Sequence, residues 1–347
     1  MSVLEVTGLT VDFRQRGAPP LRAVDHVSFA LEAGKTLALV GESGSGKSTV
    51  VRAVAQLMKP TAGTIVLDGR PAGRRGRALR AYRHKVALVF QDPFASLNPI
   101  HTVRHHLVRP LSLRPGAPRG AALEEEVREL LRSVNLTPPE EVAGKHPHEL
   151  SGGQRQRVAI ARALATDPDV LLADEPVSML DVSIRLEILN LLDRLKRDRN
   201  LALLYVTHDL ATARHFSAEI MVMYRGEIVE RGPSDEVILR PAHPYTQLLA
   251  AAAPEPGASR SKLAVDRQAR RASQAARQAA RAAGAGRVAE QREAAAGAGC
   301  QFRARCPHAM EICATRPPDA TVGPAHRALC WLHDPAGAGA APSEMAG

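Results

Sequence analysis

Short apolar runs separated by polar segments recur along the first two thirds of the chain. Each run is four or five residues long and almost uninterrupted by polar side chains. This pattern is typical of β-strands that are buried on both faces of a sheet. The runs that predict such strands are Thr36–Val40, Val86–Phe90, Val170–Ala173 and Leu203–Val206.

Between these runs, apolar residues recur at spacings of three and four. That period places them on one face of an amphipathic helix. Buried strands that alternate with such helices predict a largely parallel α/β sheet. The two clearest sets are Val127, Leu130, Leu131 and Val134, and Ile188, Leu191, Leu192 and Leu195.

Shorter strands are predicted around this alternating core. A Pro/Gly loop from Gly17 to Pro20 should connect the first two of them. The Pro-punctuated, helical sequence from about residue 92 to 165 predicts a helical insert in a domain that spans residues 1–254. The shorter strands are Val3–Phe13, Val27–Leu31, Ile65–Leu67, Glu219–Tyr224 and Ile228–Arg231.

The composition changes after Pro254. Residues 255–298 are rich in Ala, Arg and Gln with few branched apolar residues, so we expect a mobile linker with partial helicity; the alternative is a solitary helix. Residues 299–334 contain all four cysteines and predict a compact module. Residues 335–347 are rich in Ala, Gly and Pro and should form a disordered tail.

The net charge of +10 comes largely from that linker. Residues 260–293 hold nine basic and three acidic residues, which leaves six of the ten charges there. Such a segment is typical of a solvated linker, with contact to anionic lipid headgroups as the alternative. Nucleic acid is not an expected partner, because only 3% of residues are aromatic. No run reaches the roughly 18–20 apolar residues that span a bilayer, and no signal peptide is indicated.

The stretch from Gly41 to Thr49 matches the phosphate-loop pattern, two glycines four residues apart followed by Lys and a hydroxyl residue. Backbone N–H groups of such a loop converge on phosphate oxygens at a helix N-terminus. Lys47 should reach the β- and γ-phosphates, and Ser48 should face Mg²⁺. The predicted nucleotide-binding residues of the loop are Gly41, Ser43, Gly44, Ser45, Gly46, Lys47, Ser48 and Thr49.

Two acidic residues, Asp174 and Glu175, end the predicted strand that begins at Val170. Beside a phosphate loop, the first acid should hold Mg²⁺ and the second should deprotonate an attacking water. A second anion-receptive helix start is predicted at Ser151, Gly152 and Gly153, just before the helix that opens with Gln154.

Leu150–Arg157 carries the sequence LSGGQRQR, and here the chain resembles the nucleotide-binding subunits of ABC transporters. The resemblance implies a P-loop NTPase fold with a RecA-like α/β core, an antiparallel β subdomain and a helical insert. It also implies ATP and Mg²⁺ as cofactors. The subunits of this family pair head to tail, so that Ser151, Gly152, Gly153 and Gln154 of one subunit complete the ATP site of the other.

Other motifs of the family follow in order. Gln91 matches the Q-loop, which contacts Mg²⁺ and water; Ser178–Asp181 matches the D-loop, although Met179 departs from its usual small residue. His208 matches the histidine that contacts the γ-phosphate, and Phe13 matches the aromatic residue that stacks on adenine. The resemblance therefore implies that Glu175, His208 and Gln91 are catalytic.

A narrower resemblance is to the dipeptide/oligopeptide and nickel importer ATPases. It rests on Phe90–Pro99, Asp174–Arg185, His243–Thr246 and the four cysteines. It implies two membrane-spanning permease subunits, a second and similar ATPase subunit (a homodimer is the alternative) and, indirectly, an external solute-binding protein. The implied location is the cytoplasmic face of the membrane.

The cysteines Cys300, Cys306, Cys313 and Cys330 are separated by 5, 6 and 16 residues. Four thiolates suit either an iron–sulfur cluster or tetrahedral zinc. Cys-x-x-Cys pairs are absent from the sequence, which favours a [4Fe–4S] cluster over zinc; metal-free thiols remain the third alternative.

Two other functions are compatible with parts of the sequence. A soluble ABC ATPase that acts on nucleic acid or ribosomes shares the ATPase motifs. However, Gly41 and Ser151 lie about 110 residues apart without an intervening coiled coil, and the chain has a single ATPase domain. A redox or iron–sulfur protein with an ATPase fold would require activity that depends on the cysteines.

Overall fold

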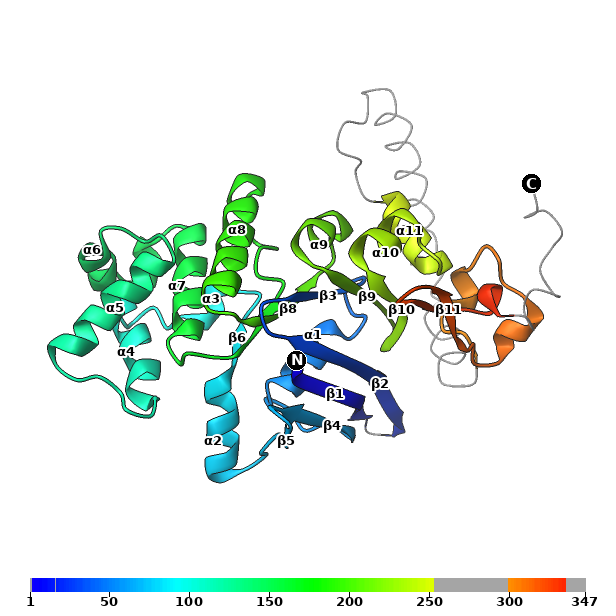
Figure 1. Ribbon diagram of the computed structural model, residues 1–347, viewed down its shortest axis with the longest axis horizontal. Helices are drawn as coiled ribbons and strands as arrows, with labels where there is room; N and C mark the ends of the chain where they lie inside the picture. Colours follow the sequence, from blue (N-terminus) through cyan, green and yellow to red (C-terminus); the bar gives the residue numbers. More distant parts are fainter. Residues whose placement is uncertain (1, 16, 253–298, 335–347) are drawn as a thin grey trace, which may run out of the picture.

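The computed structural model describes residues 2–15, 17–252 and 299–334. The predicted linker and tail lie outside these residues. The described chain contains one large mixed sheet, a smaller antiparallel sheet and helices on both sides of the large sheet (Figure 1). None of its described helices is long and apolar enough to cross a membrane.

The eight-stranded sheet has the order β11-β12-β10-β9-β3-β8-β7-β6. Its centre is parallel, as predicted: β9, β3, β8, β7 and β6 run in one direction. The remaining strands pair antiparallel. The bounds are β3 (Thr36–Val40), β6 (Val86–Val89), β7 (Val170–Asp174), β8 (Ala202–Thr207), β9 (Glu219–Tyr224), β10 (Glu227–Pro233), β11 (Asp319–Gly323) and β12 (His326–Leu329).

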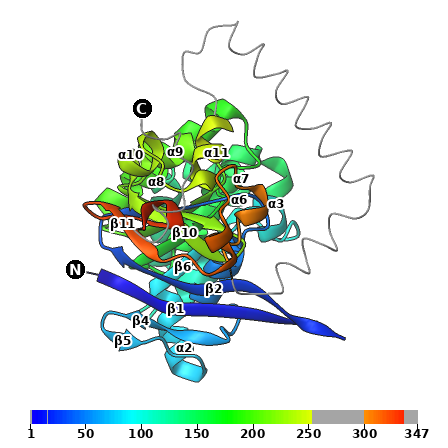
Figure 2. The same ribbon diagram turned by 90° about the vertical axis from the view of Figure 1, so that its right-hand side faces the viewer.

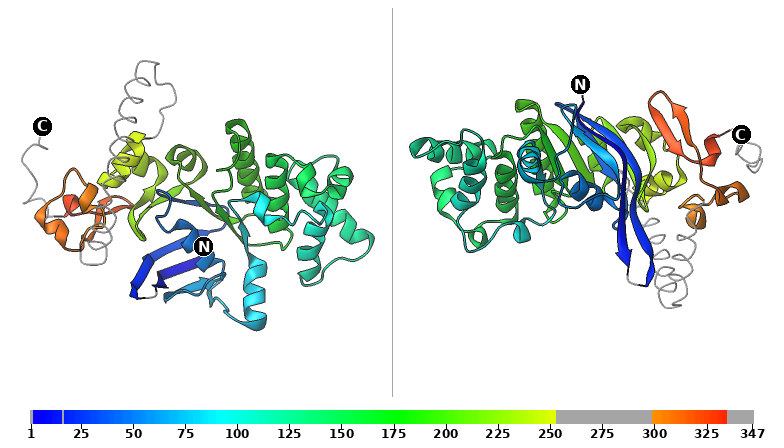
Figure 3. Two further views of the ribbon diagram at one scale, coloured as in Figure 1. Left: turned by 180° about the vertical axis from the view of Figure 1, so that it is seen from behind. Right: turned by 90° about the horizontal axis from the view of Figure 1, so that it is seen from below.

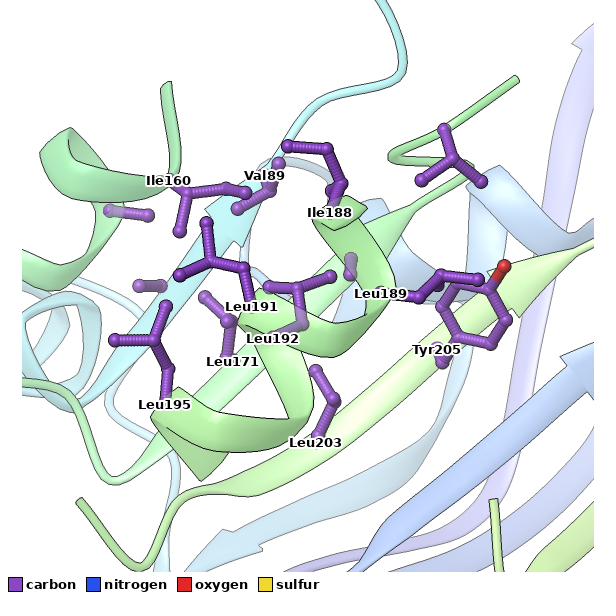
Figure 4. Close-up of a cluster of buried hydrophobic side chains, with 14 of the residues drawn as sticks. Val89, Ile160, Leu171, Ile188, Leu189, Leu191, Leu192, Leu195, Leu203 and Tyr205 are labelled. Atoms are coloured by element: carbon purple, nitrogen blue, oxygen red, sulfur yellow. The ribbon is translucent and has the colours of Figure 1, made fainter. Parts of the chain in front are cut away.

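The central strands are buried on both faces, which explains why their sequences do not alternate with polar residues. On β3, Ala38 and Val40 belong to one hydrophobic cluster while Leu37 and Leu39 belong to another. The first cluster lies under the helices of the insert and α8 (Val182–Asp198), which packs Ile188, Leu191 and Leu195 against it (Figure 4). The predicted amphipathic helix 188–195 is therefore confirmed.

The second sheet is antiparallel, with the order β2-β1-β4-β5. Figures 1 and 2 show it on one side of the large sheet, with α9, α10 and α11 on the other. The predicted loop from Gly17 to Pro20 is wrong: β2 already begins at Ala18. An edge strand tolerates Pro19 and Pro20, because it has no second neighbour that needs their missing N–H groups. The bounds are β1 (Ser2–Gln15), β2 (Ala18–Glu32), β4 (Ala62–Leu67) and β5 (Arg70–Pro71).

Residues 92–165 form the expected helical insert, which lies at the β6 edge of the large sheet (Figure 1). The predicted apolar face of α5 is confirmed, because Val127, Leu130 and Leu131 are buried. A polar helix, α2 (Gly76–Lys85), was not predicted, since it buries only Tyr82. The helices of the insert are α3 (Pro93–Ser96), α4 (Val103–Leu113), α5 (Ala121–Ser133), α6 (Pro139–Gly144), the 3-10 helix Pro147–Glu149, and α7 (Gly152–Leu164).

Three further helices are α9 (Leu210–Phe216), between β8 and β9, and α10 (Ser234–Leu239) and α11 (Pro244–Ala252), which follow β10. After the undescribed segment, residues 299–334 lie at the end of the molecule opposite to the helical insert (Figures 1 and 3). We call these residues the cysteine module. It contains the 3-10 helices Arg303–Arg305, Glu311–Ala314 and Trp331–His333 as well as the hairpin β11–β12.

The cysteine module is joined to the large sheet. Strand β12 pairs with β10, where Glu230 lies opposite Ala328 and Arg231 opposite Arg327. The Glu230 carboxylate is fully buried and accepts hydrogen bonds from the N–H groups of Ala242 and His243, each at 2.8 Å. His326 lies 2.7 Å from the same carboxylate. The Glu230 carboxylate therefore links the cysteine module to the core. Moving the module away would leave this buried carboxylate without His326, and an unpaired buried polar group costs free energy of folding.

Candidate functional site

The phosphate-loop sequence connects β3 to α1 (Lys47–Val54). Gly46, at the N-cap of α1, has a φ of 107°, which side chains disfavour. A Cβ atom on Gly41 would lie 2.2 Å from the Met223 carbonyl oxygen. The glycines therefore let the loop turn tightly against β9, with the N-terminus of α1 open and without a side-chain cap.

Lys47 lies inside this loop and is only 4% exposed. Its Nζ donates to the carbonyl oxygens of Gly41, at 2.8 Å, and Glu42, at 3.0 Å. Burial lowers the pKa of Lys47, although the nearby carboxylates oppose this shift. A cation held among backbone carbonyls is poised to exchange them for the oxygens of an anion.

The end of β7 meets the start of α1. The Ser48 hydroxyl donates to Asp174 Oδ1 at 3.0 Å. Burial raises the pKa of the Asp174 carboxyl, an effect that the Ser48 hydrogen bond partly offsets. A hydroxyl and a desolvated carboxylate side by side form the oxygen donor set that a hard divalent cation such as Mg²⁺ accepts.

Glu175 is the point where the other predicted residues meet. Gln91 Nε2 donates to its Oε2 at 3.2 Å, and His208 Nδ1 lies 3.2 Å from the same oxygen. Lys47 Nζ is 3.8 Å from the other carboxylate oxygen. The backbone of Glu175 has a φ of 46°, and its N–H donates to the Val206 carbonyl at 3.0 Å. Gln91, Glu175 and His208 follow β6, β7 and β8, so the carboxyl ends of these parallel strands bring the three side chains together.

The second predicted anion site lies elsewhere. Ser151 caps α7: its hydroxyl accepts from the Gln154 N–H at 3.2 Å, and the Gln154 side chain accepts from the Ser151 N–H at 3.0 Å. Ser151 is exposed, and Gly153 is buried against Ile184 of α8. Figure 1 places α7 with the helical insert and α1 beneath β3, so one chain does not bring its two anion sites together.

Two more predicted residues are exposed. Phe13, towards the end of β1, is 41% exposed, as a ring available for stacking must be. Met179 is 54% exposed, whereas Leu180 beside it is buried. The segment between Glu175 and α8 is held by the Ser178 hydroxyl, which donates to the Glu175 carbonyl at 3.1 Å.

One contact at the phosphate loop has no signal in the sequence. Arg305 of the cysteine module donates to both carboxylate oxygens of Glu42, each at 3.0 Å. The Tyr245 hydroxyl accepts the Glu42 N–H at 2.9 Å. Because these partners lie more than 200 residues from Glu42, no local pattern indicates them.

The four cysteines are free thiols and all line one small cavity in the cysteine module. Burial raises the pKa of Cys300 to about 11 and that of Cys330 to about 12. Four thiols around one cavity are the donor set of a tetrathiolate centre. However, no group of three or more His, Cys, Asp or Glu side chains in the described parts of the chain is arranged so that it could hold a metal ion.

Two family models match the chain. Residues 24–178 match the ABC transporter family. Residues 229–313 match the C-terminal region of oligopeptide/dipeptide transporters. The first match contains the phosphate loop, Gln91, the α7 start and Glu175, and the second contains three of the four cysteines.

Curated relatives cover nearly the whole chain. A probable peptide ABC transporter ATP-binding protein of Sinorhizobium fredii is 41% identical over 322 residues, which cover 92% of this chain and 85% of that protein. The oligopeptide transport ATP-binding protein AppF of Bacillus subtilis is 39% identical and covers 92% of each chain. A glutathione import ATP-binding protein of Pectobacterium atrosepticum is 46% identical over 74% of this chain and 42% of its own length.

A solved structure supports the fold. It is a dimeric ATP-binding cassette in a post-hydrolysis state, bound to ADP and phosphate. Its sequence is 32% identical, and the superposition has a TM-score of 0.60 over 67% of this chain and 98% of the other.

Proposed function

The chain belongs to the ATP-binding subunits of ABC transporters of the oligopeptide/dipeptide type, and we propose that it hydrolyses ATP to drive the import of peptides or related small solutes. The observation that carries the proposal is the convergence of Lys47, Gln91 and His208 on the Glu175 carboxylate. The names of the relatives support peptides as the transported class.

We assign substrate binding to the loop and its lysine. The open N-terminus of α1 and the loop N–H groups receive phosphate oxygens. Lys47 leaves the carbonyls of Gly41 and Glu42 for the β- and γ-phosphates. Phe13 offers its exposed ring to adenine.

Ser48 and Asp174 are the residues that would hold Mg²⁺, with Gln91 approaching from β6. The 3.0 Å contact between the Ser48 hydroxyl and Asp174 fits a shared cation, which would neutralise charge on the phosphates. Because burial already penalises the charged form of Asp174, a bound cation should favour its ionised form.

Glu175 is placed to accept a proton from water. Its neighbours Gln91 and His208 hold one carboxylate oxygen, which leaves the other directed towards Lys47. A base fixed in this way, next to the phosphate loop, can orient a water molecule for attack on the γ-phosphate and take up its proton. We assign His208, which lies beside Glu175, to contact with the γ-phosphate.

The exposed start of α7 supports a site shared between two subunits. Ser151, Gly152, Gly153 and Gln154 would close the γ-phosphate side of a partner's loop, and the partner would do the same here. The related cassette of known structure is itself a dimer. We propose that the partner is a second, similar ATPase, and that both subunits attach to two permease subunits at the cytoplasmic face of the membrane, with an external protein delivering the solute.

Replacing Glu175 with Gln tests the proposal. The change keeps the side chain's size and removes its basicity, so turnover should fall by about 10²–10⁴-fold. ATP affinity should stay within about twofold, because Lys47 and the loop are intact. Phosphate release and binding of a fluorescent ATP analogue measure the two quantities. Glu187→Gln, at an exposed carboxylate of α8, is the control. Near-normal phosphate release from Glu175→Gln would remove Glu175 from the role of base.

For the cysteine module we propose a [4Fe–4S] cluster held by Cys300, Cys306, Cys313 and Cys330, with Zn²⁺ as the alternative. The support is the donor set, four thiols that line one cavity; in the described residues they are not arranged to hold a metal ion, so binding would have to bring them closer together. Purification without oxygen, followed by assays of iron, acid-labile sulfide and zinc, separates the two. About four iron and four sulfide per chain identifies the cluster; the absence of all three elements would leave free thiols.

A further inference from the structure

The cysteine module contacts the phosphate loop directly through one side chain. Arg305 donates two hydrogen bonds of 3.0 Å to the Glu42 carboxylate, one to each oxygen. This bidentate geometry is the strongest form of an arginine–carboxylate pair. The carboxylate raises the pKa of the Arg305 guanidinium further above its ordinary value. Both side chains are partly shielded, with exposed fractions of 30% and 38%.

Two aromatic rings lie close to the Arg305 guanidinium. The guanidinium carbon lies 5.7 Å from the centre of the Tyr224 ring and 5.6 Å from that of Phe302. Phe302 is buried and packs edge-on against Tyr224, while Tyr245 contacts both. Tyr245 also accepts the Glu42 N–H through its hydroxyl. Glu42 is therefore fixed at its backbone by α11 and at its carboxylate by the module.

The position of Glu42 in the phosphate loop indicates a function for its ion pair with Arg305. Glu42 follows Gly41 in a loop that must receive the oxygens of a triphosphate, and its own carboxylate is an anion at that position. Left unpaired, a carboxylate there repels the ligand and can draw Lys47 away from it. We propose that Arg305 is a positioning residue that neutralises Glu42 and holds it away from the phosphates, so that the cysteine module sets the affinity of the site for ATP. The inference rests on the proposed function of the loop.

A second ion pair of the module provides a matched comparison. Arg316 also reaches from the module to the core, where it contacts Glu227 at 3.0 Å and Asp25 at 3.7 Å. It is 52% exposed, and within the described part of the chain its ion pairs are with Glu227 and Asp25 and not with Glu42. If Arg305 only helped to dock the module, loss of Arg316 should have a similar consequence.

The test is the KM for ATP in steady-state hydrolysis by the full chain assembled with its partner ATPase. Arg305→Ala should raise KM about threefold to tenfold and leave kcat within about twofold, because Glu175 and its neighbours are untouched. Arg305→Lys, which keeps the charge and loses the bidentate hydrogen bonding, should raise KM about twofold. Arg316→Ala should leave KM unchanged. An unaltered KM in Arg305→Ala, or an equal rise in Arg316→Ala, overturns the proposal.

A double variant separates positioning from docking. Glu42→Gln removes the carboxylate that Arg305 neutralises, so Arg305→Ala combined with Glu42→Gln should return KM to within about twofold of the wild-type value. Failure of this rescue would show that Arg305 acts by supporting the module alone. If Arg305→Ala does not fold, as judged by circular dichroism, Arg305→Lys with and without Glu42→Gln gives the same comparison. Absence of hydrolysis in the assembled complex of the wild-type chain with its partner ATPase would instead contradict the proposed function itself.

Discussion

Helix α1 begins just after Gly46 and helix α7 begins with Gly152 and Gly153, yet their first turns are built differently. At α1 the cap is Gly46, which offers no side chain, and the turn is surrounded by Lys47, Asp174 and Glu175. At α7 the cap is Ser151, whose hydroxyl already occupies the Gln154 N–H. Ser151 is exposed, and the α7 turn lies with the helical insert (Figure 1).

A helix N-terminus thus serves two purposes in this molecule, ligand binding at α1 and presentation to another molecule at α7. The α1 turn leaves its N–H groups open and supplies its own charges, which is what a ligand-binding end requires. The α7 turn satisfies part of its own hydrogen bonding, so it stays ordered while exposed to water. A helix end that is stable without a ligand can be presented to another molecule in a fixed shape.

The largest effect should come from the α1 side. Lys47→Ala removes the buried cation that would bind the β- and γ-phosphates, so affinity for ATP should fall by about a hundredfold or more. Lys35→Ala, at an exposed lysine paired with Glu32 in the turn before β3, is the control and should bind normally. Equilibrium binding of a fluorescent ATP analogue measures both. If the Lys47 variant binds ATP as tightly as the control, Lys47 does not bind the phosphates, and the proposed ligand-binding role of the α1 turn is contradicted.

A smaller effect is expected on the α7 side. Ser151→Ala should leave ATP binding to the isolated chain unchanged but lower kcat about tenfold to a hundredfold, because it removes a donor that acts on a partner's γ-phosphate. Ser151→Thr keeps the hydroxyl and serves as control. Hydrolysis should be measured over a range of protein concentrations, since the shared site requires assembly. A change in ATP affinity of the isolated chain would place Ser151 in its own site instead.

The smallest effect concerns stability. Ser151→Ala also removes the cap of α7, which should lower the free energy of unfolding by about 1 kcal/mol. Ser151→Asp keeps a capping oxygen and should retain that stability, yet its carboxylate should repel a partner's phosphates and lower turnover at least as much as Ala does. Urea unfolding combined with phosphate release tests this separation. Equal stability of all three proteins would contradict a structural role for the capping box.

Much of this site could be predicted because its residues follow buried strands. Strands β3, β6, β7 and β8 are uninterrupted apolar runs, and parallel strands bring their carboxyl ends to one edge of the sheet. The side chains after those runs, among them Gln91, Glu175 and His208, lie together at those ends, while the roles of Gln91 and His208 were implied by the family resemblance. The parallel α/β sheet followed from the alternation of strands and helices, and the helical insert from the Pro-punctuated, helical sequence between them.

What could not be predicted depends on contacts between distant residues. Strands β11 and β12 are short and follow a long segment of different composition, so nothing local indicates that β12 pairs with β10. The Glu230–His326 pair and the Glu42–Arg305 pair join residues 96 and 263 positions apart. The prediction of a loop at Pro19 and Pro20 failed because proline favours loops in general but is also tolerated at the edge of a sheet.

The 263 positions that separate Glu42 from Arg305 also separate the two in time while the protein is made. At a synthesis rate of about 5–20 residues per second, the phosphate loop leaves the ribosome roughly 13–50 s before its arginine. The parallel core can fold during this interval, but Glu42 waits for its partner until the last part of the chain emerges. A nascent or prematurely terminated chain would then bind ATP more weakly than the finished one, which favours the use of ATP by completed subunits.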